Sequence, residues 1–326
     1  MVQSAGRTDF HDLLPPQQSM LEEVRAGLAK PQKELAPKFF YDTRGCELFE
    51  AICRQPEYYP TRAELALMHK HARAMAGLLG RGCTLIEIGC GNSDKTRALL
   101  EQLQPRIFVP VDIAREQLEA SCLALAESFA DMRIVAVRAD FARHIALPVA
   151  ELGTARRVLY FPGSTIGNFT PAEARAFLAR WAPLLGPGGG ALIGVDLKKS
   201  PVILDAAYND AQGVTAEFNL NVLQHINREL GADFDVRGFR HRACYVPAAG
   251  RIEMHLESLK AQRVTLDGRA LEFRAGETIH TENSCKYEIA EFQALARAAG
   301  FEPHTAWTDD DGLFSVHYLT LPGQAL

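Results

Sequence analysis

The feature that most constrains the fold is a repeated alternation of short apolar runs with longer amphipathic stretches, starting at Thr84. The apolar runs that indicate strands cover residues 84–89, 106–112, 133–140, 156–163 and 189–196. The amphipathic stretches that indicate helices cover residues 94–103, 115–129 and 171–185. Strands that alternate with helices need crossover connections, which build a parallel sheet covered on both faces. The sequence therefore predicts an α/β fold with a doubly wound sheet.

The pattern breaks after residue 197 and resumes near the end of the chain. A helical stretch over residues 214–230 precedes alternating strands within residues 251–266. A helix over residues 288–300 is followed by residues 301–321, which read as two strands joined by an acidic turn. Class I methyltransferases close their parallel sheet with such an antiparallel strand pair. We therefore expect a Rossmann-like sheet of that class, interrupted by an inserted α+β domain.

Composition excludes several classes of protein. With 47% hydrophobic and 23% charged residues, the chain has ordinary globular composition, and its net charge of -5 gives no overall attraction to nucleic acid or anionic membranes. No signal peptide or long apolar run is evident. The seven cysteines include no CxxC pair, which argues against a disulfide framework. We expect a cytoplasmic monomer that binds neither membrane nor nucleic acid.

No metal site is expected either. His69 and His71 are close in sequence, but no further ligand residues accompany them.

The strongest local motif is the glycine turn in TLIEIGCGNSDKTR, residues 84–97. A strand, a tight glycine turn and a helix N-terminus together form a nucleotide-binding element. A dinucleotide fingerprint would need a third glycine where this chain has Asp94, and a P-loop would need glycine immediately before Lys95. Both phosphate-binding interpretations fail at the same acidic residue.

S-adenosylmethionine (SAM) fits the turn better, because it carries no phosphate and its methionine end is cationic. Gly89 and Gly91 form the turn, and Asp112 follows the second strand about twenty residues later, where a carboxylate can bind ribose hydroxyls. The third strand ends in Asp140 and Phe141, which suit the adenine amine and ring edge. Three accidental turn residues remain the alternative interpretation.

The loop after the fourth strand should contact the methyl acceptor. It reads FPGSTIGNFTP and lacks the Asn/Asp-Pro-Pro-Tyr motif of enzymes that methylate amide or nucleobase nitrogen. Its polar members include Gly163, Thr165 and Asn168. An asparagine amide can donate to a carboxylate and accept from an amine, as an amino acid requires, although an ordinary turn asparagine fits equally well.

Six stretches in order then carry a resemblance that covers nearly the whole chain from about residue 37. They are FFYDTRGCELFEAICRQPEYYPTRAE, GCGNSDKTR, FPGSTIGNFTP, YNDAQGVTAEFNLNVL, RIEMHLE and TENSCKY. Together they resemble the histidine-specific Nα-methyltransferases of ergothioneine biosynthesis. The resemblance implies SAM as cofactor and free L-histidine, with its mono- and dimethyl forms, as substrate. The product would be the trimethylated betaine, hercynine.

The resemblance also implies roles for individual residues. Those matching the cofactor site are Gly89, Gly91, Lys95, Asp112, Asp140 and Phe141. Those matching the site for the amino acid's carboxylate and amine are Asn168 and Tyr208, with Gly163 and Thr165 nearby. Those matching the imidazole site are Tyr58, Met254, Glu282 and Ser284. Tyr41 matches a tyrosine near the amine and is our candidate proton acceptor; with Asn168 it makes up the proposed catalytic pair.

The imidazole assignment agrees with elementary chemistry. Glu282 and Ser284 are two residues apart, so they project to the same face of an extended chain. A carboxylate and a hydroxyl can serve the two ring nitrogens, and they would be left unsatisfied by an amino acid without them. Alone, TENSCKY could be an ordinary polar turn, Met254 a core residue and Tyr58 simple aromatic packing.

The predicted domains follow from these assignments. Residues 1–61 and 199–286 would form the substrate-binding domain, and residues 62–198 and 287–326 the SAM-binding domain. Residues 1–30 have no role beyond that of a surface segment. Two rival functions remain open: the same fold could act on another amino acid such as tryptophan or tyrosine, or the chain could bind SAM without catalysis.

Overall fold

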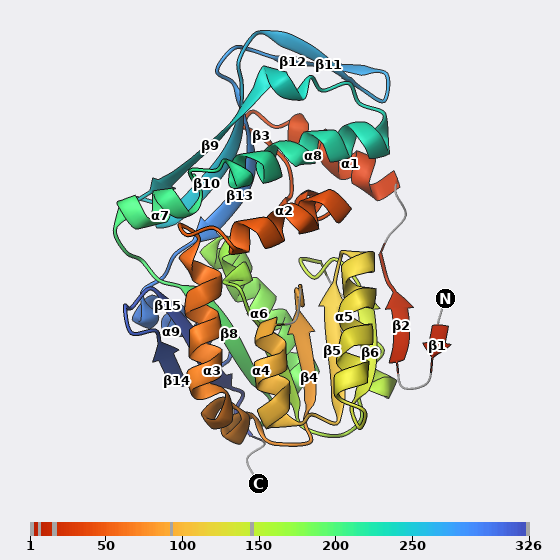
Figure 1. Cartoon of the computed structure of the whole chain (residues 1–326), viewed down its shortest axis with the longest axis vertical. Helices are drawn as coiled ribbons and strands as arrows, with labels where there is room; N and C mark the ends of the chain where they lie inside the picture. Colours follow the sequence, from red (N-terminus) through yellow and green to blue (C-terminus); the bar gives the residue numbers. More distant parts are fainter. Residues whose placement is uncertain (1–2, 6–7, 15–17, 92–93, 144–146, 324–326) are drawn as a thin grey trace. The chain divides into compact units, whose positions relative to one another are not determined.

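The computed structural model describes residues 3–5, 8–14, 18–91, 94–143 and 147–323, and it divides the chain into two compact units. Unit 1 consists of Met1–Leu14, Pro60–Lys198 and Cys285–Leu326. Unit 2 consists of Pro15–Tyr59 and Lys199–Ser284. Each unit is therefore assembled from segments far apart in sequence, which Figure 1 shows by the colours of its elements.

Unit 1 is built on a nine-stranded sheet with the order β1-β2-β6-β5-β4-β7-β8-β15-β14. In that order the strands are Gln3–Ala5, Thr8–Asp12, Arg133–Arg138, Ile107–Asp112, Thr84–Ile88, Arg157–Phe161, Gly190–Asp196, Phe314–Thr320 and Glu302–Thr308. The strands from β2 to β8 are parallel, whereas β15 pairs antiparallel with β8 and with β14. The doubly wound sheet and its C-terminal antiparallel pair are thus confirmed.

Helices cover both faces of this sheet (Figure 1). They are α3 Tyr59–Leu79, α4 Asp94–Leu103, α5 Arg115–Ser128, α6 Pro171–Leu185 and α9 Ile289–Ala298, with short 3-10 turns η2 Val149–Glu151 and η3 Thr165–Asn168. One core cluster joins Ile86 to Phe177 of α6 and Phe292 of α9. The other joins Leu85 to Met68 of α3. Because neighbouring residues of β4 enter opposite cores, its near-continuous apolar sequence is explained.

The N-terminal segment differs from its predicted place. We assigned residues 1–61 to the substrate-binding domain, but β2 pairs in parallel with β6, with Thr8 opposite Ile134. The physical reason is that β6 would otherwise be an edge strand with unpaired backbone groups. Arg133 of β6 also forms a 2.8 Å ion pair with Asp9. Residues 8–14 therefore extend the large sheet of unit 1.

Unit 2 contains a four-stranded sheet with the order β3-β13-β10-β9 and a separate hairpin of β11 and β12. These strands are Lys33–Glu34, Thr278–Cys285, Arg251–Ser258, Phe239–Val246, Gln262–Leu266 and Arg269–Phe273. Its helical elements are α1 Gln18–Leu28, η1 Pro37–Phe40, α2 Thr43–Cys53, α7 Pro201–Ala207, α8 Val214–Leu230 and η4 Val236–Gly238. Alternating burial along β10 gives this sheet one apolar and one more polar face.

Helix α8 is fixed to the apolar face by a buried asparagine. The Asn219 side chain donates to the backbone oxygen of His255 at 3.0 Å and accepts from the Thr281 hydroxyl at 2.8 Å. A buried amide with its hydrogen-bonding groups satisfied fixes the register of α8 against β10 and β13.

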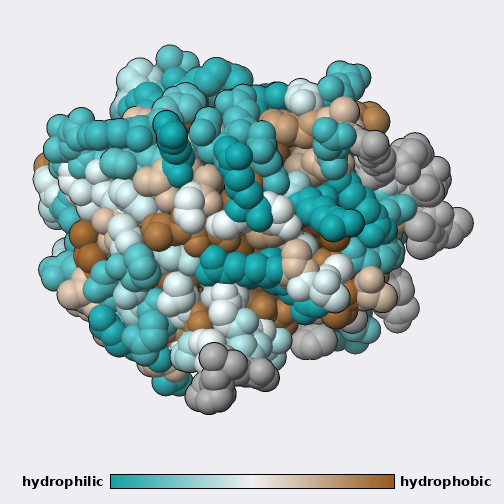
Figure 2. All heavy atoms as spheres, turned by 90° about the horizontal axis from the view of Figure 1, so that it is seen from below, coloured by the Kyte–Doolittle hydropathy of each residue, from teal (hydrophilic) through white to brown (hydrophobic). Residues whose placement is uncertain are grey.

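Figure 2 shows one face of the molecule, where hydrophilic side chains predominate and apolar ones form small groups between them. Among the described residues, no helix combines the length and apolarity that crossing a bilayer requires.

Candidate active site

The predicted cofactor turn lies at the carboxyl end of β4 in unit 1. Gly89 and Gly91 have φ values of 70° and 49°, which explains glycine at both positions. The Gly89 N–H donates to the Val111 oxygen at 2.8 Å, which ties the turn to β5. A Cβ added at either glycine would have no described atom within 4 Å. The turn therefore borders open space that a ligand can enter.

Asp112 lies beside this turn, as its position at the end of β5 predicted. One carboxylate oxygen accepts from the Ala114 N–H at 3.0 Å, and the other accepts from the Gly91 N–H at 3.5 Å. Burial raises the pKa of Asp112, while these backbone N–H groups act in the opposite direction. The carboxylate is thus held next to the glycine turn, where it can bind a ribose.

Asp140 and Phe141 follow β6 at the same edge of the sheet. The Ala139 N–H donates to the Asp112 backbone oxygen at 2.9 Å, which joins the two strand ends. The Asp140 carboxylate accepts from the Ala142 N–H at 3.1 Å, and Phe141 packs edge-on against Phe161 with ring centroids 5.8 Å apart. The structure therefore brings the three predicted strand ends together.

The base of the turn contains a second acid, Glu87 of β4. Burial raises the pKa of Glu87 to about 8, although the Thr96 hydroxyl, which donates to it, and Lys95 lower it. The neutral, protonated acid therefore predominates at pH 7. It links β4 to α4 without adding a full negative charge beneath the turn.

Lys95 was predicted to contact the cofactor, and the structure gives it a protein partner. Its Nζ lies 2.6 Å from a carboxylate oxygen of Glu64, a fully buried residue of α3. The Gly163 N–H donates to both Glu64 oxygens, at 3.0 and 2.9 Å. Glu64 thus positions Lys95 and the loop after β7 at once.

Sequence reasoning missed Glu64. The available signal was an acid on the face of α3 that also presents Leu67 and Met68 to the core. A fully buried carboxylate needs a positive partner or hydrogen-bond donors, and Glu64 has Lys95 and the Gly163 N–H.

The loop after β7 holds the remaining predicted residues of unit 1. The Thr165 hydroxyl donates to the Pro162 oxygen at 3.0 Å, so it closes the loop on itself. Asn168 ends η3 and is partly buried. Within the described part of the chain, its side-chain amide has no hydrogen-bond partner. Among the described residues, none competes with a ligand for this amide.

Two contacts hold this loop against neighbouring backbone. The Ser164 hydroxyl oxygen accepts from the Asp196 N–H at 2.9 Å, and the Asp196 carboxylate forms a buried 2.6 Å ion pair with Lys286. A Cβ on Gly167 would lie only 2.8 Å from the Cys285 oxygen, so only glycine fits there. The loop is thus packed against the segment that immediately follows Ser284 in sequence.

Unit 2 brings together four residues predicted to bind the amino acid. The Tyr208 phenol donates to the Ser284 hydroxyl oxygen at 2.7 Å, and both residues are buried. The Tyr58 and Tyr208 rings lie 6.3 Å apart. Burial raises the pKa of Tyr58 well above its usual value, and Tyr208, Cys53 and the Glu282 carboxylate raise it further. Tyr58 therefore stays a neutral phenol beside an acid.

Tyr208 is positioned by His241, which sequence reasoning also missed. The His241 Nε2 donates to the Tyr208 backbone oxygen at 2.9 Å, and its Nδ1 accepts from the Asn219 amide at the same distance. Burial lowers the pKa of His241, so the neutral ring predominates at pH 7. The sequence contains one signal for this role: His241 lies in β9 and belongs to no motif or metal-ligand pattern.

Tyr41 and Met254 lie in the same unit. The Tyr41 ring contacts Phe49 and Phe218 edge-on at 5.9 Å each, and Phe49 in turn contacts Tyr58. Tyr41 thus belongs to a continuous aromatic group with Tyr58. Met254 is 1% exposed and lies on the apolar face of β10, which also agrees with the core interpretation.

Comparison with known proteins agrees with this chemistry. The family model described as "Histidine-specific methyltransferase, SAM-dependent" matches residues 20–321. The chain is 43% identical over 304 residues to the histidine N-alpha-methyltransferase of Mycobacterium tuberculosis, spanning 91% of this chain and 94% of that protein. The protein of that name from Mycolicibacterium smegmatis is 41% identical over 305 residues, with 92% and 94% of the two chains covered.

A solved structure also resembles the chain. It is 1,6-didemethyltoxoflavin-N1-methyltransferase of Burkholderia thailandensis with bound S-adenosylhomocysteine, at a TM-score of 0.43 and 16% identity. The match covers 86% of this chain and 88% of that one.

Proposed function

The chain belongs to the family of histidine-specific, SAM-dependent methyltransferases, and we propose that it methylates the α-amino nitrogen of free L-histidine three times. The product is hercynine, with one S-adenosylhomocysteine released at each transfer, and the reaction is the first step of ergothioneine biosynthesis. The observation that carries the substrate assignment is the group of Tyr58, Tyr208, Glu282 and Ser284 in unit 2.

This group supplies hydrogen-bonding partners of both kinds for an imidazole. Neutral imidazole has one N–H donor and one nitrogen acceptor. The Glu282 carboxylate accepts from the N–H. The Ser284 hydroxyl, whose oxygen accepts from Tyr208, is assigned to the other ring nitrogen. Tyrosine and tryptophan side chains do not satisfy both partners, which is the proposed basis of selection.

Asn168 is assigned to the amino acid's α-carboxylate. A charge-assisted hydrogen bond of this kind contributes about 1.5–3 kcal/mol. The absence of a hydrogen-bond partner for the Asn168 amide among the described residues supports the assignment. As methyl groups accumulate, the amine loses its donors, so the carboxylate and ring contacts must hold the mono- and dimethyl forms in place.

For the cofactor, the residues of unit 1 suit SAM. Open space borders Gly89 and Gly91, the Asp112 carboxylate is held beside them, and Asp140 and Phe141 follow on the next strand. When bound, SAM supplies an electrophilic methyl group on a sulfonium. Because the electrophile is already activated, we assign to the protein mainly alignment and exclusion of water.

The reacting α-amine must be neutral, so a proton has to leave it. Tyr41 is the proposed acceptor, directly or through water, with the proton passing to solvent. The aromatic contacts of Tyr41 fix the position of its ring, and its phenol oxygen is the atom proposed to accept the proton. A Tyr41→Phe variant should lower kcat more than it raises KM for histidine.

Product stoichiometry tests the proposal. With limiting histidine and excess SAM, purified protein should release three S-adenosylhomocysteine molecules per histidine, and NMR should show one nine-proton N-trimethyl signal. A ratio of one with monomethylhistidine accumulating would overturn trimethylation. Methylation of an imidazole nitrogen would overturn the assigned acceptor atom.

A further inference from the structure

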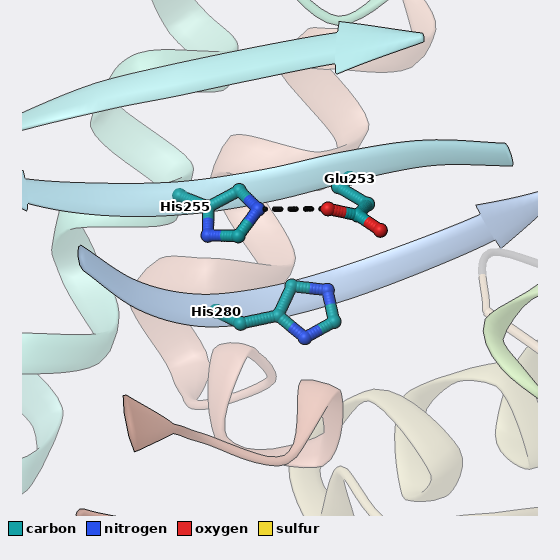
Figure 3. Close-up of side chains that lie close together, drawn as sticks. All are labelled: Glu253, His255 and His280. Atoms are coloured by element: carbon teal, nitrogen blue, oxygen red, sulfur yellow. Dashed lines mark hydrogen bonds and ion pairs between the residues drawn. The ribbon is translucent and has the colours of Figure 1, made fainter. Parts of the chain in front are cut away.

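Three side chains of metal-binding type meet on the polar face of the sheet in unit 2. Glu253 and His255 are two residues apart on β10 and so share a face, and His280 comes from the neighbouring strand β13. One ligand atom from each residue can be chosen such that all lie within 4.8 Å of one another. Figure 3 shows the two imidazoles and the carboxylate gathered on the two strands.

The distances approach those of a coordination site. His255 Nε2 lies 3.2 Å from a Glu253 carboxylate oxygen. Two ligand atoms of a tetrahedral zinc ion, each about 2.0–2.2 Å from the metal, are about 3.3–3.5 Å apart. The His255 and His280 ring centroids lie 4.9 Å apart with a 31° tilt, so the two imidazoles are direct neighbours across β10 and β13.

The hydrogen bonds leave ligand lone pairs on both histidines. His280 Nε2 donates to the Glu282 backbone oxygen at 3.0 Å, so the lone pair of the neutral ring is on Nδ1. This N–H to carbonyl contact is the outer-shell arrangement typical of metal-bound histidine. His255 Nδ1 is buried and has no hydrogen-bond partner among the described residues. His255 Nε2 donates to Glu253 in the metal-free protein, so a metal bound at Nε2 would replace that hydrogen bond and leave the ring proton on Nδ1.

The protonation states also suit a cation. Burial lowers the pKa of His255, which favours the neutral imidazole that binds metals. Hydrogen bonds from Arg251 and His255 hold the pKa of Glu253 below its usual range despite its burial. The carboxylate is therefore ionised at neutral pH.

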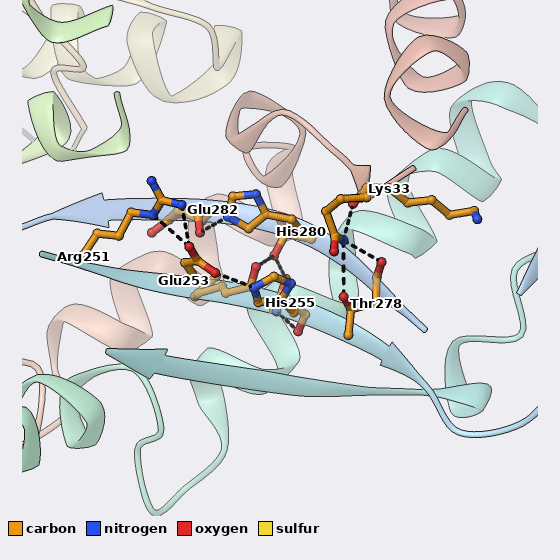
Figure 4. Close-up of polar contacts among 11 residues, drawn as sticks. Lys33, Arg251, Glu253, His255, Thr278, His280 and Glu282 are labelled. Atoms are coloured by element: carbon orange, nitrogen blue, oxygen red, sulfur yellow. Dashed lines mark hydrogen bonds and ion pairs between the residues drawn. The ribbon is translucent and has the colours of Figure 1, made fainter. Parts of the chain in front are cut away.

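Two nearby arginines should lower the affinity of this group for a cation. Arg251 donates to one Glu253 oxygen at 2.9 and 2.5 Å, which orients the carboxylate, while the second oxygen faces His255 Nε2 (Figure 4). Arg242 lies directly opposite His255 on β9. Their positive charge opposes a cation, so binding should be weaker than at a structural zinc site with three or four thiolates.

We propose that Glu253, His255 and His280 bind one divalent transition-metal ion of the Zn²⁺ type, with water in the remaining position. Two imidazoles and one carboxylate are the donor set of zinc and its first-row neighbours rather than of Mg²⁺ or Ca²⁺. The ion would link β10 to β13 next to Glu282 and so stabilise the folded protein. This assignment is independent of the proposed methyl acceptor.

The test is Zn²⁺ titration of the metal-free, tag-free full chain against a chromophoric chelator, without histidine, which would itself chelate the metal. We expect one equivalent bound and a rise in Tm with Zn²⁺. Even outer-shell substitutions reduce metal affinity about 10–100-fold. We therefore expect the affinity for Zn²⁺ to fall at least about tenfold in each of Glu253→Gln, His255→Ala and His280→Ala. His69→Ala, at an exposed histidine of α3, is the control and should bind as the parent does.

Co²⁺ gives the second readout. Its absorption spectrum should show nitrogen and oxygen ligation without a cobalt–thiolate band. Glu253→Gln, which keeps the side-chain shape, separates loss of a ligand from loss of folding. The proposal is overturned if the parent binds no equivalent of Zn²⁺, if all three variants bind as well as His69→Ala, or if a thiolate band places the ion on cysteine.

Discussion

The Tyr208 phenol donates a 2.7 Å hydrogen bond to the Ser284 hydroxyl, so two residues 76 positions apart act as one unit. If this bond orients Ser284 for the substrate ring, Tyr208→Phe and Ser284→Ala should each lower kcat/KM for histidine. The free-energy loss in kcat/KM for the double variant should be smaller than the sum of the losses for the two single variants. The difference, the coupling free energy, should be about 0.5–1.5 kcal/mol. Steady-state kinetics of the four proteins measure it.

Tyr245→Phe, in β9, provides the matched control, since no hydrogen bond of its phenol is seen within the described structure. It should leave kcat/KM unchanged. Strict additivity of the Tyr208 and Ser284 effects would contradict the proposed coupling.

Replacing Glu282 should change the choice of amino acid. Glu282→Ala removes the proposed acceptor for the imidazole N–H, so KM for histidine should rise by about tenfold or more, matching loss of a charge-assisted bond of about 1.5–3 kcal/mol. The penalty for tryptophan should fall, because the Glu282 carboxylate is no longer present to be left without its ring N–H. Competition assays with both amino acids measure the ratio. Glu272→Ala, at an exposed acid of β12, should change neither value; unchanged histidine kinetics in Glu282→Ala would exclude the ring assignment.

Glu64 should govern both stability and cofactor binding. Glu64→Ala leaves Lys95 and the Gly163 N–H without their buried acceptor, and breaking such a pair costs about 3–5 kcal/mol. Urea unfolding should show this loss. Glu64→Gln retains one acceptor, so it should fold and raise KM for SAM more than KM for histidine. Glu101→Gln on exposed α4 surface is the control, and equal unfolding free energies for parent and Glu64→Ala would refute the role.

The buried acid Glu87 predicts a specific pH dependence of stability. Its folded-state pKa of about 8 exceeds the unfolded value of 4.5, so the folded protein binds the extra proton between these values. The stabilisation of the folded protein by this proton is fully present below pH 4.5 and is lost as pH rises through 8. His317, whose pKa burial lowers to about 4, acts oppositely but only below about pH 6.5.

Between pH 6.5 and 8, the parent should therefore lose about 1–2 kcal/mol of unfolding free energy relative to Glu87→Gln. Glutamine keeps an acceptor for the Thr96 hydroxyl while removing the titration. Denaturant unfolding at both pH values measures the difference. Parallel pH profiles of the two proteins would contradict the raised pKa.

The sequence predicted those parts of the fold that depend on local pattern. Buried parallel strands read as continuous apolar runs, and the helix over residues 214–230 has the predicted bounds. Strand β2 has the sequence TDFHD, which lacks a clear apolar pattern, and its place depends on pairing with β6 far along the chain. Long-range pairing of a short polar strand leaves no local signal.

Among the residues of the candidate site, those placed by local pattern could also be predicted, and those placed by tertiary packing could not. Asp112 and Asp140 could be predicted because carboxyl ends of parallel strands meet at one edge of the sheet. Glu64 could not, since its partners Lys95 and Gly163 reach it only through tertiary packing. The His255 and His280 pair likewise forms only when β10 and β13 are placed side by side.

The most direct test of the central claim is mass spectrometry of all twenty proteinogenic amino acids after incubation with the protein and SAM. The account predicts that histidine alone gains three methyl groups. Methylation of another amino acid in place of histidine would overturn the assigned acceptor, and methylation of none would contradict the proposed function altogether.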